Sequence, residues 1–211
     1  MYYYLLYILI FNVILYFIFF YTESSNEPYI IEGDYIFQRD PLNKGEYSRF
    51  NHKTKECVNW VSKTICNEIL LCKKLKPKIL VLGVALGDMI IHLSNKRKDF
   101  IITGVDISDI NFKIVKLYTN ATLIKEDANI FIRNTENTYD YIICDIFDSI
   151  TIPDFIFSDE FINKINNILL PNGKFMINTV NIEKSKIDQS FRNIRYDMKT
   201  NYINTIYIIN K

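Results

Sequence analysis

From Lys78 to Val180, short apolar runs alternate with segments long enough to form helices. The apolar runs are Lys78–Val84, Phe100–Ile107, Ala121–Lys125, Tyr141–Ile146 and Lys174–Val180. The segments between them are Asp88–Lys96, Ser108–Tyr118, Asn129–Arg133 and Ser158–Leu170. Runs that are apolar on both faces predict strands covered on both sides, and their alternation with helices predicts parallel pairing. The pattern indicates an α/β fold with a doubly wound, mostly parallel sheet and helices on both faces.

Three further elements are predicted outside this series. Tyr29–Phe50 is expected to form one or two short strands, because turn-forming residues separate its apolar groups. Cys57–Cys72 has apolar residues at a helical period, which predicts a helix packed on the sheet. Asn204–Asn210 is predicted to be a last strand at or near an edge of the sheet.

The run Tyr2–Tyr21 carries no charged side chain. About 20 apolar residues in a helix cross the hydrocarbon core of a bilayer, and the run lacks the basic start and small-residue cleavage site of a signal peptide. We therefore predict a single N-terminal hydrophobic helix that anchors the chain in a membrane, with its orientation open. Two alternatives remain: a cleaved signal that leaves the protein secreted or lumenal, and a helix buried against a partner.

Charge and cysteine usage exclude several classes of function. The 25 Lys and Arg residues nearly balance the 24 Asp and Glu residues, so the net charge is only +1. Such a chain has no basic field for nucleic acid, and we expect no nucleic-acid partner. The four cysteines show no C-x-x-C spacing and only two histidines are present, so no metal site is predicted. The cysteines are expected to be reduced thiols in the core.

Candidate functional residues follow the predicted strands. The first strand enters a turn with small residues at Gly83, Ala85 and Gly87, and such a turn brings backbone N–H groups close to a ligand. Asp106 ends the next strand, about 20 residues further on, where a carboxylate can accept both hydroxyls of a ribose. The later strands are also followed by acids, at Glu126-Asp127, Asp145 and Asp148. Carboxyl ends of parallel strands share one edge, so these acids indicate one ligand site; solvated turn acids are the alternative.

The series VLGVALGD, GVDIS, EDANIFI, YDYIICDIFD and IPDFIFSDEFINKINNILLPNGKFMINTV resembles class I S-adenosylmethionine-dependent methyltransferases. In the linked order of its motifs it is most similar to their spermidine synthase-like branch. The resemblance covers about residues 75–180 and implies a Rossmann-like methyltransferase sheet. The chain is then predicted to comprise an anchor or signal-like helix (1–21), a linker (22–28), a short β segment (29–55) and a methyltransferase-like domain (56–211).

The resemblance also implies roles for single residues. It implies that the donor is bound by Gly83, Ala85, Gly87, Asp88, Asp106, Ile107, Asp127, Ala128 and Asp145. In this set the glycine-containing turn would hold the methionine part, Asp106 the ribose, and Asp127 with Ala128 the adenine. Asp145 matches the family acid that deprotonates or orients the attacking amine, and Asp148 is the second acid of that motif. A carboxylate suits this role because the nucleophile must lose a proton.

Departures from the family pattern shape the predicted reaction. Aminopropyltransferases usually carry an acid inside the glycine turn, where this chain has Leu86. The absence of N-P-P-[YF] argues against methylation of nucleic-acid bases, and the absence of G-x-G-x-x-G argues against a nicotinamide dehydrogenase. We predict a transferase that uses S-adenosylmethionine, or its decarboxylated form, and moves a methyl or aminopropyl group to a small amine-type acceptor. The alternatives are a polyamine aminopropyltransferase and a non-catalytic binding or scaffold protein. Oligomeric state stays open, a homodimer included.

Overall fold

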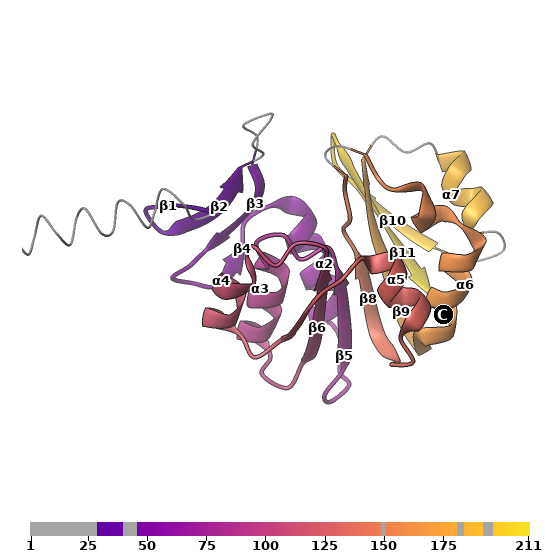
Figure 1. Cartoon of the computed structure of the whole chain (residues 1–211), viewed down its shortest axis with the longest axis horizontal. Coiled ribbons are helices and arrows are strands. Elements are labelled where there is room, and N and C mark those ends of the chain that lie inside the picture. The colour runs from indigo at the N-terminus through magenta and orange to yellow at the C-terminus, as the bar shows by residue number, and fades with distance from the viewer. Residues whose placement is uncertain (1–28, 40–45, 149–150, 181–183, 192–195) are drawn as a thin grey trace, which may run out of the picture.

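The computed structural model describes residues 29–39, 46–148, 151–180, 184–191 and 196–211. A seven-stranded sheet has the order β10-β11-β9-β8-β5-β6-β7 (Figure 1). Its strands are β5 (Lys78–Leu82), β6 (Ile101–Asp106), β7 (Thr122–Lys125), β8 (Tyr139–Cys144), β9 (Leu169–Val180), β10 (Tyr196–Thr200) and β11 (Asn204–Asn210). The neighbours from β9 to β7 pair in parallel, whereas β11 and β10 are antiparallel. The prediction of a mostly parallel sheet is confirmed, and β11 lies next to the edge strand, as expected.

Helices cover both faces of this sheet (Figure 1). One face carries α2 (Trp60–Leu70), α3 (Asp88–Lys96) and α4 (Phe112–Tyr118); the other carries α5 (Ala128–Asn134), α6 (Asp159–Ile168), α7 (Lys184–Ser190) and the short 3-10 helix η1 (Asp154–Phe157). Successive side chains of a strand point to opposite faces. Ile79 and Val81 of β5 therefore pack on the first group of helices, and Leu80 and Leu82 pack on the second.

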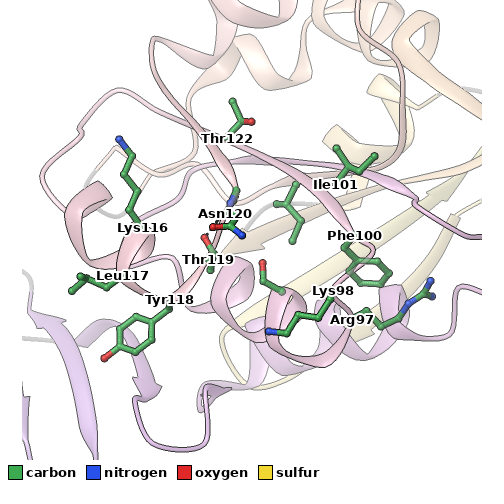
Figure 2. Close-up of a pocket in the computed structure, with 13 residues that line it drawn as sticks. Arg97, Lys98, Phe100, Ile101, Lys116, Leu117, Tyr118, Thr119, Asn120 and Thr122 are labelled. Carbon is green, nitrogen blue, oxygen red and sulfur yellow. Dashed lines mark hydrogen bonds between the residues drawn. The ribbon is translucent and has the colours of Figure 1, made fainter.

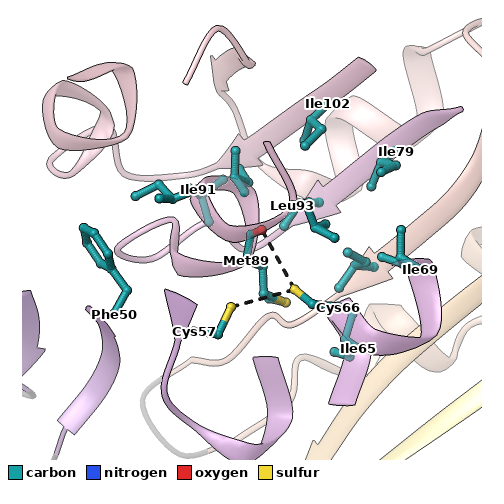
Figure 3. Packing of buried hydrophobic residues seen from close by; sticks show 14 of the residues in the cluster. Phe50, Cys57, Ile65, Cys66, Ile69, Ile79, Met89, Ile91, Leu93 and Ile102 are labelled. Carbon is teal, nitrogen blue, oxygen red and sulfur yellow. Dashed lines mark hydrogen bonds between the residues drawn. The ribbon is translucent and has the colours of Figure 1, made fainter. Parts of the chain in front are cut away.

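A second, four-stranded antiparallel sheet precedes these elements. It contains β1 (Ile30–Glu32), β2 (Tyr35–Arg39), β3 (Glu46–Asn51) and β4 (Glu56–Cys57), in that order. Phe50 and Cys57 join the buried cluster around Met89 of α3, and Cys66 of α2 lies beside them (Figure 3). The small sheet thus packs on the α3 side of the large sheet, with more strands than the one or two predicted.

Local hydrogen bonds explain where several helices begin. Ser158 caps α6, because its Oγ accepts from the backbone N–H of Phe161 at 3.3 Å. Asn59 caps α2 by accepting from the N–H of Ser62 at 2.7 Å. Ser, Asn and Asp are favoured at this position because their side chains satisfy N–H groups that the first helical turn leaves unpaired.

Two regions differ from the sequence prediction. The strand predicted to begin at Lys174 begins at Leu169, which pairs with Tyr139; the intervening turn then bulges out of the register. Neither α7 nor β10 was predicted. The strand β10 is an exposed edge strand and α7 contains a single apolar residue, Ile187, so neither shows a clear apolar period.

The predicted membrane localisation is contradicted. In the described part of the chain, no helix is long and apolar enough to cross a bilayer. The run Tyr2–Tyr21, on which the anchor was predicted, lies outside the described residues, so an N-terminal hydrophobic helix is not among the elements of the structure.

Candidate active site

The chain reverses its winding direction at β5. This strand pairs with β6 on one side and β8 on the other, which makes the carboxyl ends of β5 and β8 a topological switch point. Open α/β sheets bind ligands at this place. Gly83 follows β5 and Asp145 follows β8. A Cβ atom on Gly83 would lie only 2.2 Å from the carbonyl oxygen of Asp145, so only glycine allows the two loops to meet.

The turn after β5 has an unusual backbone. Gly83, Ala85 and Gly87 have φ values of +86°, +46° and +80°. The left-handed conformation is free of strain for glycine but costs other residues about 1–2 kcal/mol, so Ala85 is strained. A Cβ on Gly87 would lie 2.3 Å from Val115 of α4. Leu86 is fully buried in the core, and its side chain brings no polar group to the turn.

Asp106 holds this turn in place. Its Oδ2 accepts from the backbone N–H groups of Val84 at 2.7 Å and Ala85 at 3.1 Å. Its Oδ1 accepts from the N–H of Ser108 at 2.9 Å. A carboxylate offers about four acceptor positions, so about one remains for a ligand hydroxyl while these three bonds persist.

Asp127, Ala128 and Ile107 lie beside Asp106 at the same edge of the sheet. Strands β6 and β7 pair in register there, and the N–H of Glu126 donates to the carbonyl of Asp106 at 3.0 Å. Asp127 caps α5: its Oδ1 accepts from the N–H groups of the second and third residues after it, at 2.8 and 3.1 Å. Neither bond uses Oδ2. Ala128 begins α5, and the Ile107 side chain is exposed.

Among the described residues, Asn178 of β9 is the side-chain partner of Asp145. The Asn178 Nδ2 donates to Asp145 Oδ1 at 2.8 Å. Burial raises the pKa of Asp145 to about 6; the bond from Asn178 lowers this pKa, and the charge of Asp88 raises it. Asn178 was not predicted from sequence. The register could have located it, because β9 pairs with β8 up to Ile177 and Cys144, which places the next residues of both strands side by side.

Asp148 lies further along the same loop, on the surface. Its backbone forms two hydrogen bonds with the backbone of Thr151, at 2.7 and 3.0 Å. Within the described ranges, the Asp148 carboxylate makes no hydrogen bond to Asp145 or Asn178. The structure therefore brings Asp145 to the switch point and leaves Asp148 exposed beside it.

Comparisons with known proteins identify the fold of this chain. The family model of the spermine/spermidine synthase domain matches residues 107–209. A Corynebacterium glutamicum structure assigned as a probable spermidine synthase superposes with a TM-score of 0.67 and 13% identity, covering 87% of this chain and 80% of that one. The chain has the class I S-adenosylmethionine-dependent methyltransferase fold. The resemblance drawn from the sequence motifs is confirmed.

Other structures with the methyltransferase fold are similar over a shorter part. Human methyltransferase-like protein 13, solved with S-adenosylhomocysteine, gives a TM-score of 0.58 at 18% identity and covers 72% of this chain and 82% of that one. A Streptococcus mutans protein assigned as a SAM-dependent methyltransferase gives 0.57 at 17% identity over 72% of this chain. The chain spans only about half (49%) of that protein's length. None of the curated protein sequences compared matches the chain.

Two buried acceptors among the described residues fit a polar nucleoside ligand. Asn111, which contacts the turn, and Asn178, which contacts Asp145, each keep a buried side-chain oxygen without a hydrogen-bond partner. Buried acceptors are rarely left unpaired, and N–H or O–H groups of a bound ligand would satisfy them.

Asp88, which was predicted to bind the donor, has its carboxylate hydrogen-bonded within the protein. This buried residue begins α3, and its carboxylate accepts from Ser48 Oγ at 3.1 Å and from Asn59 Nδ2 at 3.5 Å. Burial raises the pKa of Asp88, and bonds from Ser62 and Ser48 lower it. The structure thus places the Asp88 carboxylate against β3 and the start of α2.

A pocket of about 430 Å³ lies at the other end of the strands (Figure 2). Its walls come from the segment before and into β6, the end of α4 and the start of β7, including Arg97, Lys98, Phe100, Tyr118 and Thr122. None of the residues predicted to bind the donor lines this pocket. It is therefore separate from the candidate active site of the methyltransferase fold.

Proposed function

We propose that this chain is an S-adenosylmethionine-dependent transferase that moves a methyl group to a small amine-type acceptor, with Asp145 as the base. The supporting observation is the position of Asp145: it follows β8 at the switch point, against Gly83 of the donor turn, and its pKa is raised to about 6. A carboxylate with this pKa is ionised at neutral pH yet is more basic than an ordinary aspartate.

The donor would lie along the carboxyl edge of the sheet, with its methionine part at the glycine-containing turn, its ribose at Asp106 and its adenine near Asp127 and Ile107. When bound, it supplies an alkyl group activated by a positively charged sulfur. Asp145 then accepts a proton from the acceptor nitrogen, and Asn178 holds the orientation of the Asp145 carboxylate. The protein's main contribution is to bring nucleophile and donor into line.

Leu86 favours methyl over aminopropyl transfer. Its side chain is fully buried, so the turn offers no acid to a donor amine at this position. Aminopropyl transfer from decarboxylated S-adenosylmethionine is the second candidate, favoured by the match to the spermine/spermidine synthase domain. A non-catalytic protein that retains the fold is the third, favoured by the use of both Asp106 oxygens within the protein.

Turnover assays on the full-length chain would test this proposal. The protein would be incubated with each donor and a panel of small amines, and alkylated products measured by mass spectrometry. General bases contribute about 100- to 10,000-fold, so Asp145→Asn should lower turnover at least 100-fold while donor affinity stays within about threefold. Asp159→Asn, an exposed acid on α6, is the matched control. Equal turnover of Asp145→Asn and the wild type would remove Asp145 as the base.

A further inference from the structure

One residue pair of the small N-terminal sheet is linked to the donor turn, residues 83–87, at two points: through Asn111 and through Asp88. In the antiparallel pair β2–β3, Gln38 lies directly opposite Ser48. Side chains of directly opposed residues lie on the same face of a sheet. Both of these side chains reach residues at or next to the turn after β5, although they come from a separate sheet.

The first contact acts on Ala85 through Asn111. The Asn111 Nδ2 donates to Gln38 Oε1 at 2.7 Å and to the carbonyl oxygen of Ala85 at 3.0 Å. Asn111 is only 3% exposed. Gln38 thereby orients the amide that holds the Ala85 carbonyl. This matters because Ala85 has a left-handed backbone, and such a conformation persists only where its surroundings fix it.

The second contact acts on the other end of the turn. Ser48 Oγ donates to Asp88 Oδ1 at 3.1 Å, and both side chains are 4% exposed. Asp88 directly follows Gly87, the cap of α3. A buried carboxylate that loses one of its hydrogen-bond donors loses part of the compensation for its desolvation, so this bond favours one position of the helix start.

We infer that Gln38 and Ser48 are positioning residues for the donor turn: the single rung that they form fixes the segment from Ala85 to Asp88 in its donor-binding shape. This inference rests on the proposed function for its role in donor binding. Its structural part, that the small sheet controls the motion of the turn, can be measured without any donor.

Hydrogen exchange of the donor-free, full-length chain measures that motion. The variants Gln38→Leu, which keeps bulk but removes the acceptor, and Ser48→Ala, which removes the donor, should each speed exchange in a peptide covering residues 83–88. A hydrogen bond of ordinary net strength corresponds to about 2- to 10-fold in opening. Gln38→Glu retains an acceptor oxygen and should exchange like the wild type. Glu32→Gln, on the exposed strand β1 of the same sheet, is the control.

Donor affinity provides the second measurement. By calorimetry, Gln38→Leu and Ser48→Ala should each weaken S-adenosylhomocysteine binding about 2- to 10-fold. The Gln38→Glu variant should bind it as tightly as the wild type does. Unchanged exchange and affinity in both variants, with thermal unfolding near that of the wild type, would overturn the inference. Faster turn exchange in both variants, together with a wild type that binds no donor, would overturn the proposed function and leave the structural part of the inference standing.

Discussion

At the scale of single residues, the Asp145 carboxyl links the active site to stability. Its pKa is raised to about 6, mainly by burial, above the value of about 3.9 in an unfolded chain. The folded state therefore holds the proton more tightly, and this group's contribution to stability falls as pH rises from about 4 through about 6.

Asp145→Asn should remove this loss of stability with rising pH. Asparagine does not titrate, and its side-chain oxygen can still accept the bond from Asn178. We expect the free energy of unfolding of the variant, relative to the wild type, to grow by about 1–3 kcal/mol between pH 4 and pH 8. Urea unfolding at several pH values measures it. The exposed acid variant Asp159→Asn should show no such growth, and a constant difference for Asp145→Asn would contradict the raised pKa.

Asn178 tunes the same group. Its bond to Asp145 stabilises the charged form and so lowers the pKa of Asp145. Asn178→Leu should raise that pKa further and move the acidic limb of the rate profile to higher pH. The measurement is turnover against pH, with the exposed variant Asn167→Ala as control. A limb that stays in place, or moves to lower pH, would contradict the role of Asn178.

The sequence predicted most of the residues that the structure gathers at this edge, because acids at the ends of parallel strands must share it. It missed Asn178 and Gln38. Both act through pairing with another strand or with a separate sheet, and the register of that pairing cannot be read from a single chain segment. The direction of the Asp88 side chain was also not predictable, since it depends on the packing of the small sheet.

At the scale of elements, the turn between β5 and α3 combines strain with close contacts. Ala85 has a left-handed backbone that glycine adopts without strain. Ala85→Gly should relieve about 1–2 kcal/mol in the folded state and lose about 0.4–1 kcal/mol through the more flexible unfolded chain, a net gain of up to about 1.6 kcal/mol.

Denaturant unfolding of Ala85→Gly tests this strain. The variant Ala85→Val is the opposite control, because a β-branched side chain tolerates the left-handed region poorly and should destabilise the protein. Destabilisation by glycine, of the size seen when glycine replaces alanine in an ordinary helix, would show that Ala85 is not strained.

The strands and helices of the βαβ series were predictable because each buries apolar residues at a regular period. The helix Asp88–Lys96 has the same bounds in sequence and structure. Neither β10 nor α7 has such an apolar period. The residues of β10 are exposed except for half-buried Tyr196, and α7 has a single apolar side chain. These elements form because neighbouring elements are present to pack against: β10 pairs with β11 along its whole length.

At the scale of the whole molecule, two sheets meet at the candidate site. The large sheet supplies the switch point, and the small sheet reaches the donor turn through Gln38 and Ser48. The proposed donor site therefore depends on contacts from both sheets.

Donor binding by the full-length chain tests whether the carboxyl edge of the large sheet is an S-adenosylmethionine site. Calorimetry would compare S-adenosylmethionine, its decarboxylated form, S-adenosylhomocysteine and NAD, for the wild type and for Asp106→Asn, with Asp159→Asn as control. We expect the wild type to prefer S-adenosylmethionine and Asp106→Asn to weaken its binding at least about 10-fold, the effect of a lost charge-assisted hydrogen bond. A folded wild type that binds none of the adenosyl donors, or that prefers NAD, would contradict this expectation.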